Sequence, residues 1–235
     1  MFLEVKNLNV GYGDVQVLWD VSFEVEKGMI VSLVGANGAG KTTLLKTISG
    51  LIHPMSGEIR FEGQSLTELS SKEIVELGIV HVPEGRRLFP DMSVEENLLM
   101  GAYRRGKDPA IKKDLDQVYE IFPRLKERRR QKAGSLSGGE QQMCAMARGL
   151  MGNPRLLLVD EMSLGLAPLI VDDLIDIVKE IHKQGTTVFI VEQDVHLALS
   201  NSDYGYVLAT GRIMMEGSSR DLLANRKIKE VFLGL

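Results

Sequence analysis

The stretch of sequence that decides the fold reads Gly35-Ala36-Asn37-Gly38-Ala39-Gly40-Lys41-Thr42-Thr43. It matches the phosphate-loop pattern G-x-x-x-x-G-K-[ST] (Walker A), follows an apolar run at 30–34 and opens a helical run at 43–48. The pattern requires this order of strand, loop and helix, because glycines let backbone N–H groups point at phosphate oxygens near a helix N-terminus. A glycine-rich turn with no ligand would need neither the lysine nor the hydroxyl. The stretch therefore predicts a P-loop nucleotide-binding fold.

Two side chains of this loop are candidates for direct chemistry. Lys41 can reach the β- and γ-phosphates of a nucleotide, and the Thr42 hydroxyl can ligate Mg²⁺. The other residues of 35–43 are expected to bind phosphate through their backbone. The predicted ligands are therefore ATP and Mg²⁺.

Two acids, Asp160 and Glu161, end an apolar run further along the chain. Ligands of α/β proteins bind at the carboxyl ends of strands. We expect Asp160 to hold the Mg²⁺ shell and Glu161 to orient or deprotonate the attacking water. Strands that end in two solvated acids are common, so the phosphate loop is what makes this pair a strong candidate.

The composition excludes several other classes of protein. A net charge of -4 over 235 residues argues against a nucleic-acid binder held mainly by phosphate neutralisation. The single cysteine, Cys144, excludes an internal disulfide and is expected to be a buried structural thiol. The four histidines lack metal-ligand spacing, so no zinc site is expected. Neither a bilayer-spanning run nor a signal peptide is recognised, so a membrane role would require a partner.

Short apolar runs alternate with helical patterns, which indicates an α/β fold. The predicted strands are 3–10, 21–25, 30–34, 58–61, 79–82, 156–159, 187–191, 204–209 and 212–216. The runs 156–159 and 187–191 are almost continuously apolar, as in strands buried on both faces. Thr210-Gly211 predicts a hairpin between the last two strands. Residues 85–135 carry charge and helical apolar spacing instead, which predicts a helical insertion.

The segment Leu136-Ser137-Gly138-Gly139-Glu140-Gln141-Gln142 identifies the family. Ser137 is a natural N-cap for the helix that follows, and the glycines leave backbone N–H groups able to hold an anion. A merely capped helix would look similar. The segment nevertheless resembles the signature of ATP-binding cassette (ABC) ATPases, the motifs follow one another in the ABC order, and the resemblance covers essentially the whole chain.

The resemblance implies an ABC-ATPase fold, with a RecA-like core, an antiparallel β subdomain and a helical subdomain insertion. It implies one domain over 1–235, with a core at 1–84 and 136–235 and the insertion at 85–135. In this family the signature of one protomer faces the nucleotide on the phosphate loop of the other. We therefore expect a head-to-tail dimer, with self or a paralogue, in which residues 137–140 contact the partner's ATP. Tyr12 lies where the family stacks an aromatic ring on adenine, although a core tyrosine is the alternative.

Three positions depart from the commonest family pattern. Glu84 replaces the usual glutamine, and as a carboxylate it can still ligate Mg²⁺. Gln193 replaces the usual histidine; it can donate a hydrogen bond to the γ-phosphate but cannot carry a proton. Ala167 stands where aspartate is usual. These changes bear on the hydrolysis rate and on communication across the dimer, and leave ATP binding as an expectation.

Within the family, the chain resembles the smaller ATPase subunit of branched-chain amino-acid importers. The resemblance rests on the segments 82–90, 92–98, 192–193 and 230–234. It implies a cytoplasmic ATPase, peripheral on the inner face of the membrane, with two permease subunits and, indirectly, an external solute-binding protein as partners. The segment Arg86-Arg87-Leu88-Phe89 is expected to dock a permease helix, unless it is a solvated loop with its apolar residues buried.

Several alternatives stay open at this point. The chain resembles other ABC systems too, such as urea or amide importers and a lipid exporter. A soluble ABC ATPase, a regulatory ATP binder that does not hydrolyse, and a small-molecule P-loop kinase are further hypotheses. The run Arg128-Arg129-Arg130 is interpreted as a solvated helix face, as most charge runs are.

Overall fold

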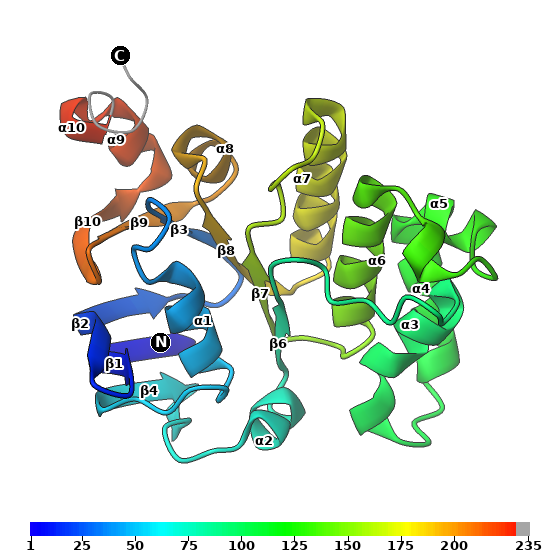
Figure 1. The fold of residues 1–235 in the computed structure, drawn as a ribbon, viewed down its shortest axis with the longest axis horizontal. Coiled ribbons are helices and arrows are strands. Elements are labelled where there is room, and N and C mark those ends of the chain that lie inside the picture. The colour runs from blue at the N-terminus through cyan, green and yellow to red at the C-terminus, as the bar shows by residue number, and fades with distance from the viewer. Residues whose placement is uncertain (229–235) are drawn as a thin grey trace. The chain divides into compact units, whose positions relative to one another are not determined.

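The computed structural model describes residues 1–228, which form two compact units. The first unit contains Met1–Ile74 and the segment that begins at Thr187, and the second is Val75–Thr186. The predicted α/β class is confirmed (Figure 1). The predicted split into a core and an insertion at 85–135 stays a prediction, and the family resemblance at 230–234 lies outside the described residues.

An antiparallel sheet of four strands forms one part of the first unit, in the order β2-β1-β4-β5. Its strands are β1 (Leu3–Tyr12), β2 (Val15–Val25), β4 (Ser56–Phe61) and β5 (Gln64–Ser65). The apolar residues of β1 point to the buried face, as a half-buried strand requires. The predicted start of β2 at 21 was wrong, because the strand begins at Val15 and its ladder with β1 shifts register three times, which breaks the regular alternation.

Parallel strands form the other part of the first unit. β3 (Ile30–Val34) pairs in parallel with β8 (Thr187–Glu192) and with β9 (Tyr204–Ala209). Every residue of β3 and β8 is buried, which confirms the prediction for the run at 187–191. The antiparallel strand β10 (Arg212–Ser218) follows through Thr210 and Gly211, which both have positive φ as a type I′ hairpin turn requires.

Helices complete the first unit. They are α1 (Lys41–Ile48), α8 (Val195–Ser200), α9 (Ser219–Ala224) and α10 (Arg226–Ile228). The short helix α2 (Ser71–Glu76) begins in this unit and ends in the second. In Figure 1, α1 lies along the antiparallel sheet. Phe189 of β8 stacks on Phe23 of β2 with ring centroids 5.5 Å apart, so an aromatic pair joins the two sheets of this unit.

The second unit combines two parallel strands with most of the helices. β6 (Ile79–Val82) pairs with β7 (Leu156–Asp160), and all of β7 is buried. The helical elements are α3 (Val94–Gly101), η1 (Tyr103–Arg105), α4 (Ile111–Ile121), α5 (Pro123–Glu127), η2 (Ala133–Ser135), α6 (Gly138–Leu150) and α7 (Pro168–Lys183). Among the described residues, no helix is long and apolar enough to span a membrane.

Cys144 lies in the core of the second unit, which confirms the expected buried thiol. Burial raises the pKa of this thiol to about 11, so almost none of it is the reactive thiolate at pH 8. We predict that a thiol reagent leaves the native chain unmodified for hours at pH 8 and labels it within minutes in denaturant. Mass spectrometry of the intact chain measures this, and rapid labelling of the native chain would contradict the prediction.

Candidate nucleotide-binding site

The phosphate loop connects β3 to α1 through residues 35–40. Both ends of the loop require glycine. A Cβ at Gly35 would collide with the carbonyl oxygen of Leu208, and Gly40 has φ 107° and packs against the side chain of Leu18. Residues 36–38 between them are exposed. The loop is thus held at both ends and open at its middle.

The N-terminus of α1 fits an anion. No side chain among residues 1–228 caps it, and its first turn contains no acid. Exposed N–H groups and the helix dipole therefore favour a negative charge at this point. Lys41 opens the helix, is only 4% exposed, and donates from Nζ to the carbonyl oxygens of Gly35 (2.8 Å) and Ala36 (3.2 Å). The ammonium group is therefore folded over the loop, where it adds positive charge to that of the helix end.

Tyr12 and Gln193 lie in the same unit as the loop. Tyr12 is 48% exposed, and its hydroxyl lies 3.3 Å from the Thr43 hydroxyl, so it is not the core tyrosine that was the alternative. Gln193 is exposed and directly follows β8, whose last residue, Glu192, lies opposite Val34 in the parallel ladder. Gln193 therefore stands at the strand end next to the start of the phosphate loop.

The candidate acids lie in the second unit. Asp160 is the last residue of β7 and is fully buried, and Glu161 follows it with φ 45°. A left-handed conformation is strained for a residue other than glycine, and such strain occurs mostly at functional sites. Val82 lies opposite Val159 in the β6–β7 ladder, so Glu84 and Glu161 each lie two residues past a paired position, at the same edge. Glu84 is exposed.

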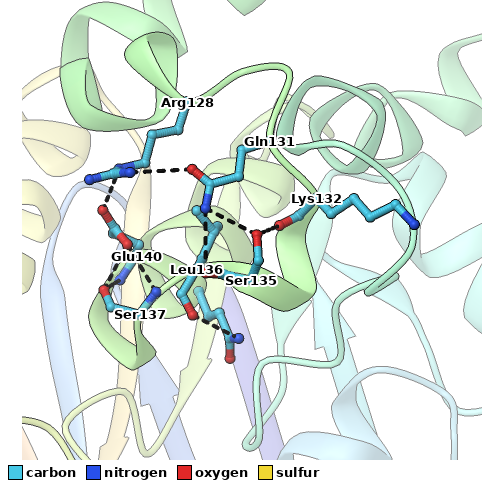
Figure 2. Close-up of polar contacts among 8 residues, drawn as sticks. Arg128, Gln131, Lys132, Ser135, Leu136, Ser137 and Glu140 are labelled. Atoms are coloured by element: carbon cyan, nitrogen blue, oxygen red, sulfur yellow. Dashed lines mark hydrogen bonds and ion pairs between the residues drawn. The ribbon is translucent and has the colours of Figure 1, made fainter.

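The signature segment forms the N-terminus of α6 by a capping box. Ser137 is the N-cap, as predicted, and its Oγ accepts a hydrogen bond from the Glu140 N–H. Glu140 Oε2 in turn accepts from the N–H (2.9 Å) and hydroxyl (2.8 Å) of Ser137. A carboxylate of the chain itself is therefore bound at this helix end (Figure 2).

Two arginines, both missed as site residues, lie against this helix end. Arg128 Nε forms an ion pair of 2.6 Å with Glu140 Oε1, although its side chain is 47% exposed, as the interpretation of 128–130 as a solvated face requires. Arg86 donates to Gln141 Oε1 at 3.1 Å and lies beside Gly138. Each contact joins residues at least twelve positions apart, so no periodicity in the sequence could reveal it.

Electrostatics keep Glu140 ionised. Partial burial by itself raises the pKa of this carboxyl group. The hydrogen bonds from Ser137 and the charges of Arg128 and Arg124 outweigh that effect and lower the pKa below its ordinary value. The carboxylate is therefore an anion throughout the neutral range.

The loop at 85–89 has a strained backbone held by α6. Arg86 and Arg87 have φ 65° and 46°, and their carbonyl oxygens accept hydrogen bonds from Arg148 at 3.0 and 2.7 Å. Asn97 is fully buried and bonds both the N–H and the carbonyl group of Phe89. The Phe89 ring remains 42% exposed, so the reading of a loop with all its apolar residues buried does not hold for this ring.

The fold and the loop between β3 and α1 define a P-loop nucleotide-binding protein. Comparison with known proteins gives the family. The family model described as ABC transporter matches residues 18–163. BraG of Pseudomonas aeruginosa, a high-affinity branched-chain amino acid transport ATP-binding protein, is 50% identical over 99% of both chains. A probable branched-chain amino acid transport ATP-binding protein of Archaeoglobus fulgidus, LivF, is 36% identical over 99% of both. The chain belongs to the ABC transporter family.

A solved structure agrees with this assignment. MJ1267, an ATP-binding cassette of an ABC transporter in its ADP conformation, superimposes with a TM-score of 0.88 at 29% identity. It covers 100% of this chain, and this chain covers 99% of it. The predicted ABC-ATPase fold is therefore confirmed for the described residues.

Ala167 provides a test of local stability. It is the N-cap of α7, and no side chain among the described residues caps that helix end. We predict that Ala167→Asp, which restores a capping carboxylate, stabilises the chain by about 1 kcal/mol. Denaturant unfolding measures the change, with Ala167→Asn as an uncharged capping control. An unchanged or lower free energy of unfolding for both variants would contradict the prediction.

Proposed function

We propose that this chain is the ATP-hydrolysing subunit of an importer of branched-chain amino acids. The proposed substrate class rests on the full-length identity of 50% with BraG. It cannot rest on a binding pocket, because an ATPase subunit of this kind has no part in binding the transported molecule. Its place would be the cytoplasmic face of the cell membrane, on two permease subunits that receive their cargo from an external binding protein.

The phosphate loop would hold the ATP. Backbone N–H groups of 35–43 bind the β- and γ-phosphates, and Lys41 neutralises part of their charge. The uncapped, acid-free start of α1 supports this role. Tyr12, with half of its side chain exposed, stacks on the adenine. Gln193 donates a hydrogen bond to the γ-phosphate from the end of β8.

The donor set fits Mg²⁺, a hard cation that prefers oxygen ligands. The Thr42 hydroxyl, the Asp160 carboxylate and the Glu84 carboxylate are the proposed ligands, together with phosphate oxygens. The bound ion would neutralise charge on the phosphates.

Glu161 is proposed as the catalytic carboxylate. It accepts a proton from the water that attacks the γ-phosphate, or orients that water. Its left-handed backbone at the end of a buried strand supports the assignment, because such strain can be retained where a side chain must point in one direction.

A second ATPase subunit would complete each site. Residues Ser137, Gly138, Gly139 and Glu140 are proposed to contact the ATP held by the partner's phosphate loop, so that two ATP molecules clamp the dimer. The partner is either a second copy or a paralogue. Hydrolysis removes the γ-phosphate contact and lets the dimer open, and that motion drives the permeases.

The catalytic role predicts the behaviour of Glu161→Gln. Phosphate release falls by about 10²-fold or more, because the amide cannot accept the proton, while ATP still binds. A phosphate-release assay with parallel equilibrium binding of ATP measures both quantities. Asp172→Asn, which changes an exposed acid of α7, serves as the matched control and keeps the parent rate. Hydrolysis at the parent rate by Glu161→Gln would show that another group is the base.

The segment Arg86-Arg87-Leu88-Phe89 is proposed to dock a permease helix, which predicts that Phe89→Ala weakens binding of the permeases selectively. Affinity purification of the tagged chain from native membranes should recover two permeases and a second ATPase, and Phe89→Ala should lower the permease yield about tenfold. Tyr103→Ala, at a side chain 72% exposed on the same unit, should not. Recovery of only soluble partners by the parent chain would leave an ATPase and remove the transporter.

A further inference from the structure

The two helix ends proposed to hold phosphate differ in charge. The first turn of α1 contains no acid, whereas Glu140 lies in the first turn of α6. The Glu140 carboxylate already accepts the backbone N–H and the hydroxyl of Ser137, the donors that a partner's phosphate would need. A phosphate that approaches this end therefore meets both an occupied set of donors and a like charge.

The two oxygens of the Glu140 carboxylate have different partners. Oε2 accepts hydrogen bonds from Ser137, while Oε1 forms an ion pair with Arg128 Nε at 2.6 Å. Arg128 follows α5, and its guanidinium also donates to Gln131 Oε1 at 3.2 Å (Figure 2). Gln131 is itself bonded to the Ser135 hydroxyl at 3.0 Å, so a chain of side chains fixes the arginine beside the signature. The Glu140 side chain is 13% exposed and the Arg128 side chain is 47% exposed, so water reaches the pair from the side of the arginine and screens it in part.

We propose that Arg128 is a positioning residue for the signature, and that it acts through Glu140. When the donors of Ser137 turn to the partner's phosphate, Arg128 retains the carboxylate and cancels its charge. The helix end can then exchange its own anion for the phosphate without a net negative charge beside it. The inference rests on the proposed ATP-clamped dimer.

A purely structural role makes a different prediction. If Arg128 only holds the segment 128–135 in place, its loss should be felt whatever residue stands at 140. If it acts on the charge of Glu140, its loss should matter only while that charge is present. A double-mutant cycle with the isosteric Glu140→Gln separates these two roles.

The experiment measures ATP hydrolysis by the protein purified with its partner subunits, resolved into KM and kcat. Arg128→Ala should lower kcat/KM about tenfold, mostly through KM, because phosphate then faces an unpaired carboxylate. Arg128→Lys, which keeps the charge, should recover most of the loss. In the Glu140→Gln background the same Arg128→Ala change should alter kcat/KM by less than about twofold. Arg130→Ala, an exposed neighbour in the same arginine run, is the matched control and should keep the parent values.

The double-mutant cycle decides whether Arg128 acts through Glu140. An Arg128→Ala effect of equal size in both backgrounds, or no effect in either, would overturn the proposal. Thermal unfolding of each variant shows whether a loss reflects the fold, and if Arg128→Ala unfolds, Arg128→Gln takes its place in the cycle. Binding of ATP to the isolated parent chain separates the two claims: a parent that neither binds nor hydrolyses ATP overturns the proposed function, whereas a normal parent with a failed cycle overturns only the role of Arg128.

Discussion

The proposed function depends on the uncapped helix end that follows the phosphate loop. The N-terminus of α1 presents its N–H groups, and no side chain of the described residues caps them. Such N–H groups are left to water or to a ligand, and they bind a ligand well only when the chain around them is held rigidly in place. The fully buried strands β3 and β8, and the glycines at both ends of the loop, supply that rigidity. A phosphate that binds there satisfies these N–H groups and so stabilises the helix end.

The signature helix solves the same problem in the opposite way. The N-terminus of α6 is capped by the pairing of Ser137 with Glu140, which satisfies two backbone N–H groups without a ligand. In the proposed mechanism this cap opens only when a partner presents its nucleotide. The phosphate would then be held directly by the phosphate loop of one protomer. On the other protomer it would replace the Glu140 carboxylate at the start of α6. Closure of the dimer would therefore depend on ATP rather than on protein contacts alone.

Much of the fold could be predicted because its strands are local patterns. The bounds of β3, β6 and β9 agree with the predictions, since each is a short apolar run between turn residues. The same is true of the cap at Ser137, which depends on two residues three positions apart. Such features are determined by residues close together in the sequence, so local sequence patterns predict them.

What could not be predicted depends on residues far apart in the chain. The pair of Arg128 with Glu140 is invisible to periodicity, because it joins an exposed side chain to a residue twelve positions further along the chain. The left-handed backbone at Glu161 and Arg86 gave no signal, because neither residue favours that conformation by itself. Tertiary contacts impose these conformations, and they lie at the candidate acid and beside the signature helix.

The central claim is that ATP hydrolysis by this chain drives uptake of branched-chain amino acids, and a transport assay tests it most directly. The protein and its partner subunits would be reconstituted into vesicles with ATP inside and a loaded binding protein outside, and uptake of labelled leucine measured. We expect uptake that requires ATP and stops with a non-hydrolysable analogue. Uptake that proceeds equally without ATP, or none while the chain hydrolyses ATP normally, would contradict it.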